Sequence, residues 1–241
     1  MSGHSKWVQI KHKKALTDAK RGKIFSKMAR LISVAAKEKG ADLKTNAKLR
    51  MALETAKTVG MPKENITRAI ERAVGAGNKE NLEEVSYEAY GPGGSAFLIF
   101  GVTDNKNRTT NEIKHLLSEH GGKLAAEGSV SWMFKKRGAV NFSKEMTSES
   151  QEDFMLKLID AGAEDVREFK EGYVAYTDPN ALDKFKGRLA EKNITDGQTF
   201  IDHIPNDPVA LLPDENKKFL VLEEALDEHD DVQEVFTNIV N

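Results

Sequence analysis

The stretch AFLIFGVTDNKNRTTNEIKHLL, residues 96–117, contains two hydrophobic periods and decides the fold class. Its first part, Phe97–Val102, is an apolar run of strand length. A Gly-Pro-Gly-Gly stretch at 91–94 precedes this run and predicts a tight turn into the strand. In the second part, apolar residues recur at helical spacing. The stretch therefore predicts a strand followed by a helix.

Residues around this stretch complete a β-α-β unit. Thr109 and Glu112 have the spacing of a capping box and predict the start of the helix. Two glycines at 121–122 predict its end. Ser129–Phe134 alternates enough to predict a second strand.

A longer series follows from Ala139. It predicts strand 139–142, helix 151–161, strands 165–169 and 173–177, helix 180–191 and strand 199–204. The order βαββαβ is that of a ferredoxin-like domain. After two prolines, a strand at 209–212, a helix at 216–226 and a strand at 232–238 would complete a second such unit. We therefore expect a multidomain α+β protein in which one ferredoxin-like α/β domain is inserted into another.

Three amphipathic helices are predicted before these domains. The first has Phe25, Met28, Ile32 and other apolar residues on one side and ends at Gly40, with Asp42 as the expected cap of the second helix. The second ends near Gly60, and Pro62 opens the third. These helices predict a small helical bundle.

The expected domains are a basic helical domain at 1–80, a discontinuous α/β domain at 81–135 and 206–241, and an inserted α/β domain at 136–205. A Gly-rich linker at 75–78 closes the first of these.

Charge is distributed very unevenly between these domains. Residues 1–80 hold 19 Lys and Arg against 7 Asp and Glu, whereas residues 81–241 hold 17 against 31. A concentrated basic segment attracts polyanions, of which nucleic-acid backbones are the commonest. The segment therefore predicts a nucleic-acid partner, either DNA or ribosomal RNA.

The predicted contacts lie mainly in the first 30 residues, where Asp18 is the only acid. Lys23, Lys27, Arg30 and Lys37 would form one stripe on a helix, and Trp7 among the lysines could stack on a base or ribose. The full predicted set is Lys6, Trp7, Lys11, Lys13, Lys14, Lys20, Arg21, Lys23, Lys27, Arg30 and Lys37. The alternative for these residues is a solvated helix face with a disordered tail.

Other polar clusters have weaker functional interpretations. Arg108, at the start of a predicted helix, could hold an anion, although plain capping is the simpler interpretation. The turn at 229–231 is the one His-carboxylate cluster, and local hydrogen bonding explains it better than a metal. No catalytic motif is present, so we expect no enzyme activity, no metal, no cofactor and no small-molecule substrate.

The bulk composition limits the remaining possibilities. The chain has no cysteine, and no apolar run is long enough to span a bilayer. No secretory signal pattern begins the chain. We expect a cytoplasmic protein without a membrane partner, and homo-oligomerisation stays open.

Six ordered motifs resemble one family. They are SGHSKW from Ser2, KRGKIFSK from Lys20, YGPGG from Tyr90, DNKNRT from Asp104, GSVSWMF from Gly128 and HDDVQEVFTN from His229. On these motifs the whole chain closely resembles the YebC/PmpR family of bacterial proteins, which is related to the mitochondrial translational activator of cytochrome oxidase subunit one.

The resemblance implies a helical domain followed by two α/β domains, one inserted in the other. It implies two functions without choosing between them: a DNA-binding transcriptional regulator in the cytoplasm, or a ribosome-associated translation factor that binds ribosomal RNA.

Overall fold

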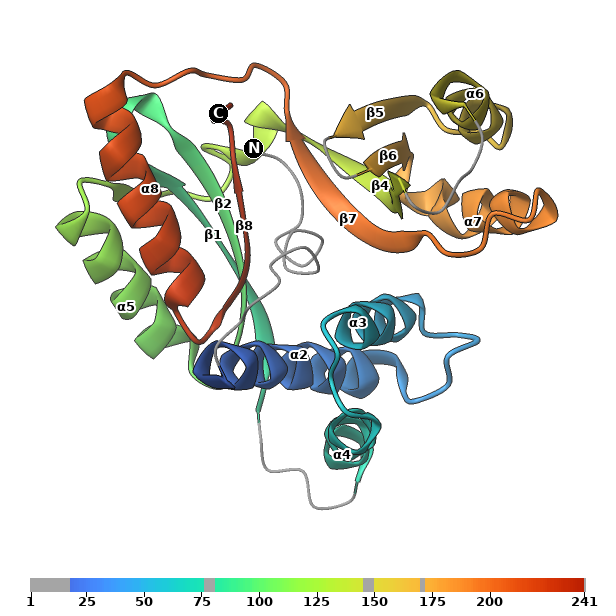
Figure 1. The fold of residues 1–241 in the computed structure, drawn as a ribbon. Coiled ribbons are helices and arrows are strands. Elements are labelled where there is room, and N and C mark those ends of the chain that lie inside the picture. The colour runs from blue at the N-terminus through green and yellow to red at the C-terminus, as the bar shows by residue number, and fades with distance from the viewer. Residues whose placement is uncertain (1–17, 76–80, 145–149, 170–171, 241) are drawn as a thin grey trace. The chain divides into compact units, whose positions relative to one another are not determined.

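The computed structural model describes residues 18–75, 81–144, 150–169 and 172–240 (Figure 1). They form two compact units. The first combines the chain up to Phe134 with the residues from Pro205 onward, and the second is Lys135–Ile204. The first unit contains a helical bundle and a four-stranded sheet, and the second contains another four-stranded sheet. The expected multidomain α+β class is confirmed.

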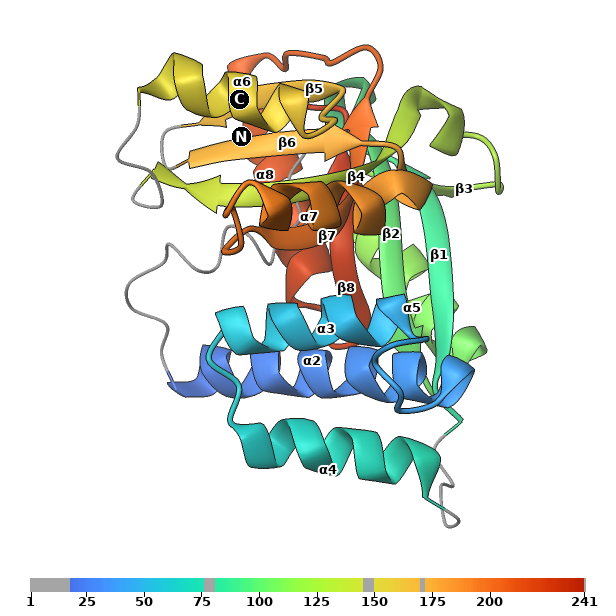
Figure 2. The ribbon, with the colours of Figure 1, turned by 90° about the vertical axis from the view of Figure 1, so that its right-hand side faces the viewer.

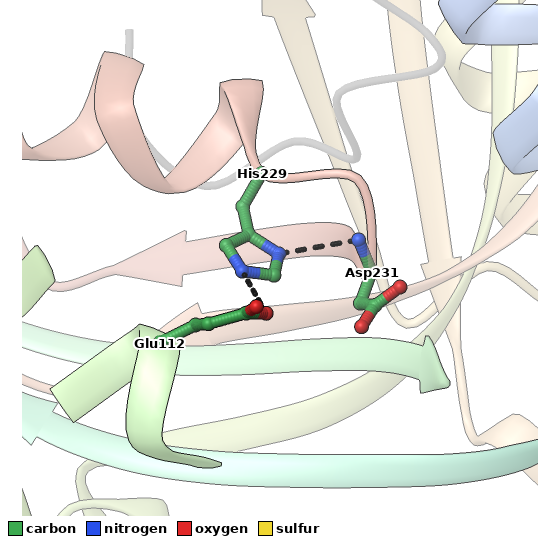
Figure 3. Close-up of side chains that lie close together, drawn as sticks. All are labelled: Glu112, His229 and Asp231. Atoms are coloured by element: carbon green, nitrogen blue, oxygen red, sulfur yellow. Dashed lines mark hydrogen bonds and ion pairs between the residues drawn. The ribbon is translucent and has the colours of Figure 1, made fainter. Parts of the chain in front are cut away.

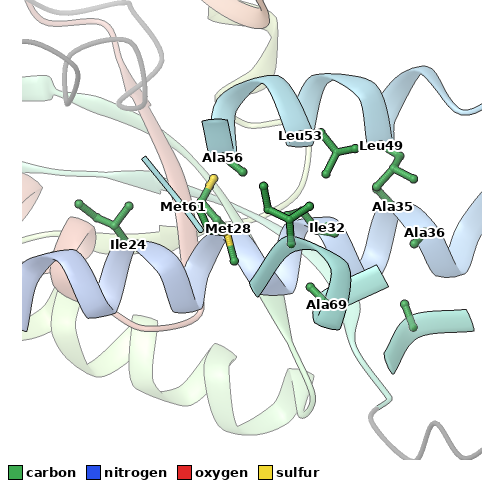
Figure 4. Packing of buried hydrophobic residues seen from close by; sticks show 12 residues of the cluster. Ile24, Met28, Ile32, Ala35, Ala36, Leu49, Leu53, Ala56, Met61 and Ala69 are labelled. Atoms are coloured by element: carbon green, nitrogen blue, oxygen red, sulfur yellow. The ribbon is translucent and has the colours of Figure 1, made fainter. Parts of the chain in front are cut away.

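The bundle consists of α2 (Asp18–Lys39), α3 (Ala47–Thr58) and α4 (Lys63–Val74). Helix α2 lies between the other two (Figure 2). Its predicted apolar side forms the core, in which Met28 and Ile32 are fully buried against residues of α3 and α4 (Figure 4). Much of this core is alanine, which lets the three helices approach closely but leaves little apolar area to stabilise the bundle.

The cap of α3 differs from the prediction. Asn46, not Asp42, is the N-cap, and its Oδ1 accepts a hydrogen bond from the Leu49 amide at 3.0 Å. The Asn46 Nδ2 also donates to the carbonyl oxygens of Ala35 at 2.7 Å and Gly40 at 2.8 Å. This fully buried side chain therefore joins the end of α2 to the start of α3.

The sheet of the first unit has the strand order β3-β1-β2-β8. Its elements are β1 (Glu83–Tyr90), β2 (Ala96–Thr103), α5 (Lys106–Glu119), β3 (Lys123–Ala125), α8 (Pro213–Glu228) and β8 (Val232–Thr237). Helices α5 and α8 cover one face of this sheet (Figure 1). A smaller apolar cluster that includes Val130, Phe134 and Phe236 covers strands on the other face.

Several predicted elements of this sheet are wrong. Residues 131–133 form a short 3-10 helix, η2, instead of a strand, and the third strand is Lys123–Ala125. The sequence 83–90, which was not assigned, forms β1 and pairs with both β2 and β3. Residues 209–212 form only an isolated bridge, between Val209 and Ile239. The element order of this domain is thus ββαβ followed by αβ, and not the βαββαβ order expected from the sequence.

Two local predictions also change. Asn105, not Thr109, caps α5, because the Asn105 Oδ1 accepts a hydrogen bond from the Arg108 amide at 3.1 Å. The predicted turn at 91–94 does lead into a strand: it contains a short 3-10 helix, η1 (Pro92–Gly94), that connects β1 to β2. Within it Gly93 has a φ of 65°, a conformation that favours glycine.

The second unit has the predicted ferredoxin-like order. Its elements are β4 (Phe134–Ser143), α6 (Gln151–Asp160), β5 (Asp165–Phe169), β6 (Gly172–Thr177), α7 (Leu182–Glu191) and β7 (Gln198–Pro205). The strand order β5-β6-β4-β7 places the last two strands beside the first, as a split βαβ arrangement requires. No helix among the described residues has the length and apolarity to cross a membrane.

Candidate nucleic-acid interface

The predicted nucleic-acid contacts divide into two groups. Lys6, Trp7, Lys11, Lys13 and Lys14 lie outside the described residues, so their role stays a prediction. The others lie on α2 and can be placed.

The first three cations of the α2 stripe face the turn between α8 and β8. The Lys23 Nζ lies 3.0 Å from the Glu228 Oε2 and 3.5 Å from the Asp230 Oδ1. Lys27 is only 3% exposed and donates to the Asp227 carbonyl oxygen at 2.8 Å. The stripe therefore contacts an acidic turn of the same chain, and its predicted contact with nucleic acid would have to compete with that turn.

Asp231 is the centre of this contact. Its carboxylate accepts hydrogen bonds from the Thr109 hydroxyl at 2.6 Å and the Arg108 guanidinium at 2.7 Å, and it pairs with Arg30. Burial alone would raise the pKa of this carboxyl, but the hydrogen bonds from Thr109, Arg108 and Arg30 lower its pKa to about 2. Asp231 is therefore a charged, buried link between α2, α5 and β8.

Arg108 is surrounded by carboxylates. Besides Asp231, its guanidinium lies 2.9 Å from the Asp104 Oδ1 and 3.7 Å from the Glu112 Oε2. Its predicted role in holding an anion remains untested, and these acids oppose it because they already balance its charge.

The remaining α2 residues lie near the helix ends. Arg21 pairs with Asp18 at 3.5 Å, and Lys20 is exposed. The Lys37 Nζ lies 3.4 Å from the Asn81 Oδ1 and is exposed.

Glu112, His229 and Asp231 have potential ligand atoms within 4.8 Å of one another (Figure 3). The His229 Nδ1 accepts a hydrogen bond from the Asp231 amide at 3.2 Å, and its Nε2 faces the Glu112 carboxylate at 3.2 Å. Both ring nitrogens of His229 therefore already face a partner, one within the turn and one on α5, and Asp231 is held by two guanidinium groups. This geometry favours the local hydrogen bonding expected for the turn over a cation site.

A groove between α2 and α4 brings Arg30, which the sequence analysis selected, together with Arg68 and Arg72, which it did not. It encloses about 400 Å³, and its lining includes Phe25, Arg30, Ser33, Asn65, Arg68 and Arg72. The Ser33 hydroxyl donates to the Ala69 carbonyl oxygen at 3.1 Å, so the two helices are tied together at the groove.

Two of the three arginines that line this groove are not part of the α2 stripe. Arg68 and Arg72 are exposed, and neither forms an ion pair with any residue that the structure describes. The exposed guanidinium groups of Arg68 and Arg72 lie beside a half-buried Phe25, whereas Arg30 is already paired with Asp231. Unpaired guanidinium groups beside an aromatic ring have the chemistry for bidentate phosphate binding and for stacking. The signal in the sequence was the i, i+4 spacing of Arg68 and Arg72, opposite the buried side of α4.

Comparisons with known proteins cover almost the entire chain. The family model "TACO1/YebC protein N-terminal domain" matches residues 5–76, and "TACO1/YebC second and third domain" matches residues 82–239. A relative from Fervidobacterium nodosum is 47% identical over 238 residues, which are 99% of this chain and 93% of the relative. A relative from Desulfitobacterium hafniense is 42% identical over 239 residues, with 99% and 95% covered. Both are named "Probable transcriptional regulatory protein".

A solved structure is also similar. The conserved hypothetical protein Aq1575 from Aquifex aeolicus has a TM-score of 0.84 and 41% identity, and the match covers 97% of this chain and 96% of that chain. Both domain models and the full-length relatives agree with the motifs found in the sequence, and this chain belongs to the TACO1/YebC family.

Proposed function

We propose that this chain is a regulator of gene expression that binds nucleic acid through its N-terminal helical domain. The observation that carries the proposal is the groove between α2 and α4, where Arg68 and Arg72 are exposed without a carboxylate partner among the described residues. The names of the relatives support the regulatory part of the proposal.

Two nucleic acids remain candidates. The names of the relatives favour DNA and a role in transcription. The groove favours RNA, because a recess between helices admits an unpaired strand or a splayed nucleotide, whereas sequence readout in duplex DNA needs a protruding element in the major groove. Binding to ribosomal RNA, as in a translation factor, is therefore the second candidate function.

The groove is tested by reversing two charges in the full-length protein. Arg68→Glu combined with Arg72→Glu should weaken binding to a structured RNA at least tenfold and reduce the slope of log K against log salt by about two units, because two phosphate contacts are lost. Lys57→Glu with Lys63→Glu is the matched control, since both lysines are exposed, lie on α3 and α4, and do not line the groove. An equal loss in the control would show that only net charge matters, and no loss in either would reject the groove.

The choice between DNA and RNA needs a measurement in cells. We would crosslink the protein in vivo and treat the recovered complexes with RNase or DNase. Loss to RNase with ribosomal RNA fragments recovered supports the translation factor, and loss to DNase with promoter enrichment supports the transcriptional regulator. Material resistant to both enzymes would contradict the proposal.

A further inference from the structure

Trp132 lies on a turn of the first unit and is not among the residues that line the groove between α2 and α4. It lies in η2 (Ser131–Met133) and is 68% exposed. A large aromatic side chain left in water loses the free energy that its burial would provide, so an exposed tryptophan indicates a contact surface when its position is fixed.

The backbone around Trp132 is fixed by a buried carboxylate. Glu88 on β1 is 9% exposed and accepts hydrogen bonds from the amides of Gly128 at 2.8 Å, Ser131 at 3.0 Å and Val130. Burial would raise the pKa of Glu88, but these three amides lower it, so the group stays ionised.

Further contacts hold the other side of the turn. The side-chain Nδ2 of Asn206 donates to the Trp132 carbonyl oxygen at 3.0 Å, and the Asn206 amide donates to the Met133 carbonyl oxygen at 2.8 Å. Val130 and Phe134 flank the tryptophan and are buried beneath the sheet. The indole thus stands on a rigid turn.

The polar edge of the indole is already satisfied within the protein. Its Nε1 donates to the Ser129 carbonyl oxygen at 2.9 Å, which also accepts from the Tyr90 hydroxyl at 2.8 Å. The Lys123 Nζ lies 5.8 Å from the centre of the Tyr90 ring. A partner would therefore meet the apolar part of the ring with a cation nearby, and would have no indole N–H to pair with.

We infer that the Trp132 turn is a second nucleic-acid contact, at which the indole stacks on an unpaired base and Lys123 neutralises a neighbouring phosphate. This inference rests on the proposed function. Stacking on an aromatic face beside a cation is the chemistry of single-strand binding without sequence preference. A protein partner is the less favoured occupant, because tryptophan at protein interfaces commonly uses its N–H, and here that group is occupied.

The test uses full-length protein carrying Trp7→Phe, in which Trp132 is the only tryptophan. Titration with an unstructured 12-nucleotide RNA should quench its fluorescence. Trp132→Ala should weaken RNA binding between about fivefold and 100-fold, whereas Trp132→Phe should retain most of the affinity because it keeps a stacking face. Leu212→Ala is the matched control, since Leu212 is 69% exposed and should not affect binding.

The outcomes separate the two proposals. Absent quenching and unchanged affinity in Trp132→Ala would overturn the inference and leave the turn to a protein partner. If the Arg68 and Arg72 variant still loses RNA binding in that case, the proposed function stands. Unchanged thermal unfolding of Trp132→Ala would attribute any lost affinity to the missing ring instead of to misfolding.

Discussion

Asp231 shows how one side chain can connect three elements. It accepts hydrogen bonds from α2 and α5 and directly precedes the last strand, and it does so as a buried anion. Removing one charged partner from such a cluster lowers the stability by more than the intact ion pair contributes, because the remaining charges stay buried without compensation.

We expect this carboxylate to give the first unit an acid-sensitive stability. Its pKa is about 2 in the folded chain against 3.8 ordinarily, so the stabilisation is present above pH 3.8 and disappears as the pH falls through about 2. A difference of this size corresponds to the order of 2 kcal/mol. Urea unfolding of the parent and of Asp231→Asn should differ most at pH 6 and converge toward pH 2.

The adjacent aspartate provides the control for that experiment. Asp230 has a side chain that is 78% exposed and lies 3.5 Å from Lys23, so Asp230→Asn should change the free energy of unfolding by less than about 1 kcal/mol. If the two asparagine variants lost equal stability at every pH, the buried cluster would not be the cause.

A second prediction at this scale concerns the Asn46 cap. Asn46→Ala should lower the stability of the bundle by about 2 to 3 kcal/mol, because the cap is lost and two carbonyl groups lose their donor. Asp42→Ala should lower the stability by less than about 0.5 kcal/mol, because the exposed Asp42 carboxylate accepts only one hydrogen bond from the described residues, that of the Lys44 amide. Thermal unfolding followed by far-UV circular dichroism would check both, and the reverse order would refute the cap assignment.

At the scale of elements, the second unit and the bundle were predictable because their hydrophobic periods are regular. The errors in the first unit have a common physical cause. Glu88 makes β1 look like a polar segment, yet its carboxylate accepts hydrogen bonds from the amides of residues 128, 130 and 131, so this segment forms no strand. Residues 209–212 are apolar, but Pro208 and Pro213 flank them and limit ladder formation. Side chains distant in sequence decided both cases.

A prediction at the scale of elements concerns the ion pairs of the α2 stripe. Lys23→Glu should reduce the stability of the first unit by about 0.5 kcal/mol, since the Lys23–Glu228 pair is half exposed and screened. Adding Glu228→Lys should restore the loss at low salt, and the effect should fade at 1 M salt. If Lys23→Glu instead abolished RNA binding with stability unchanged, and Glu228→Lys did not restore it, the lysine would contact nucleic acid directly.

At the scale of the whole molecule, the uneven charge has two consequences. The sequence predicted an external polyanion, and the structure shows that part of the basic segment is balanced by the chain's own acidic turn at 227–231. Composition could not reveal this pairing, because residues about 200 positions apart form it. The sequence analysis did not select Arg68 and Arg72, because they are only two arginines, whereas the predicted cations are dense in the first 30 residues.

The hydrogen bond between the Asn206 amide and the Met133 carbonyl oxygen brings the two ends of the inserted segment together. Because the chain ends of the first unit already meet at this point, the unit can accept or lose an inserted domain there. Doubling the length of a connecting loop costs only about 0.6 kcal/mol. Replacing residues 136–203 by a short glycine-rich loop should therefore yield a miniature protein with the host sheet and bundle intact. The same junction offers protein engineers a place to graft a foreign domain, and it gives evolution a simple route by which one α/β domain came to interrupt another.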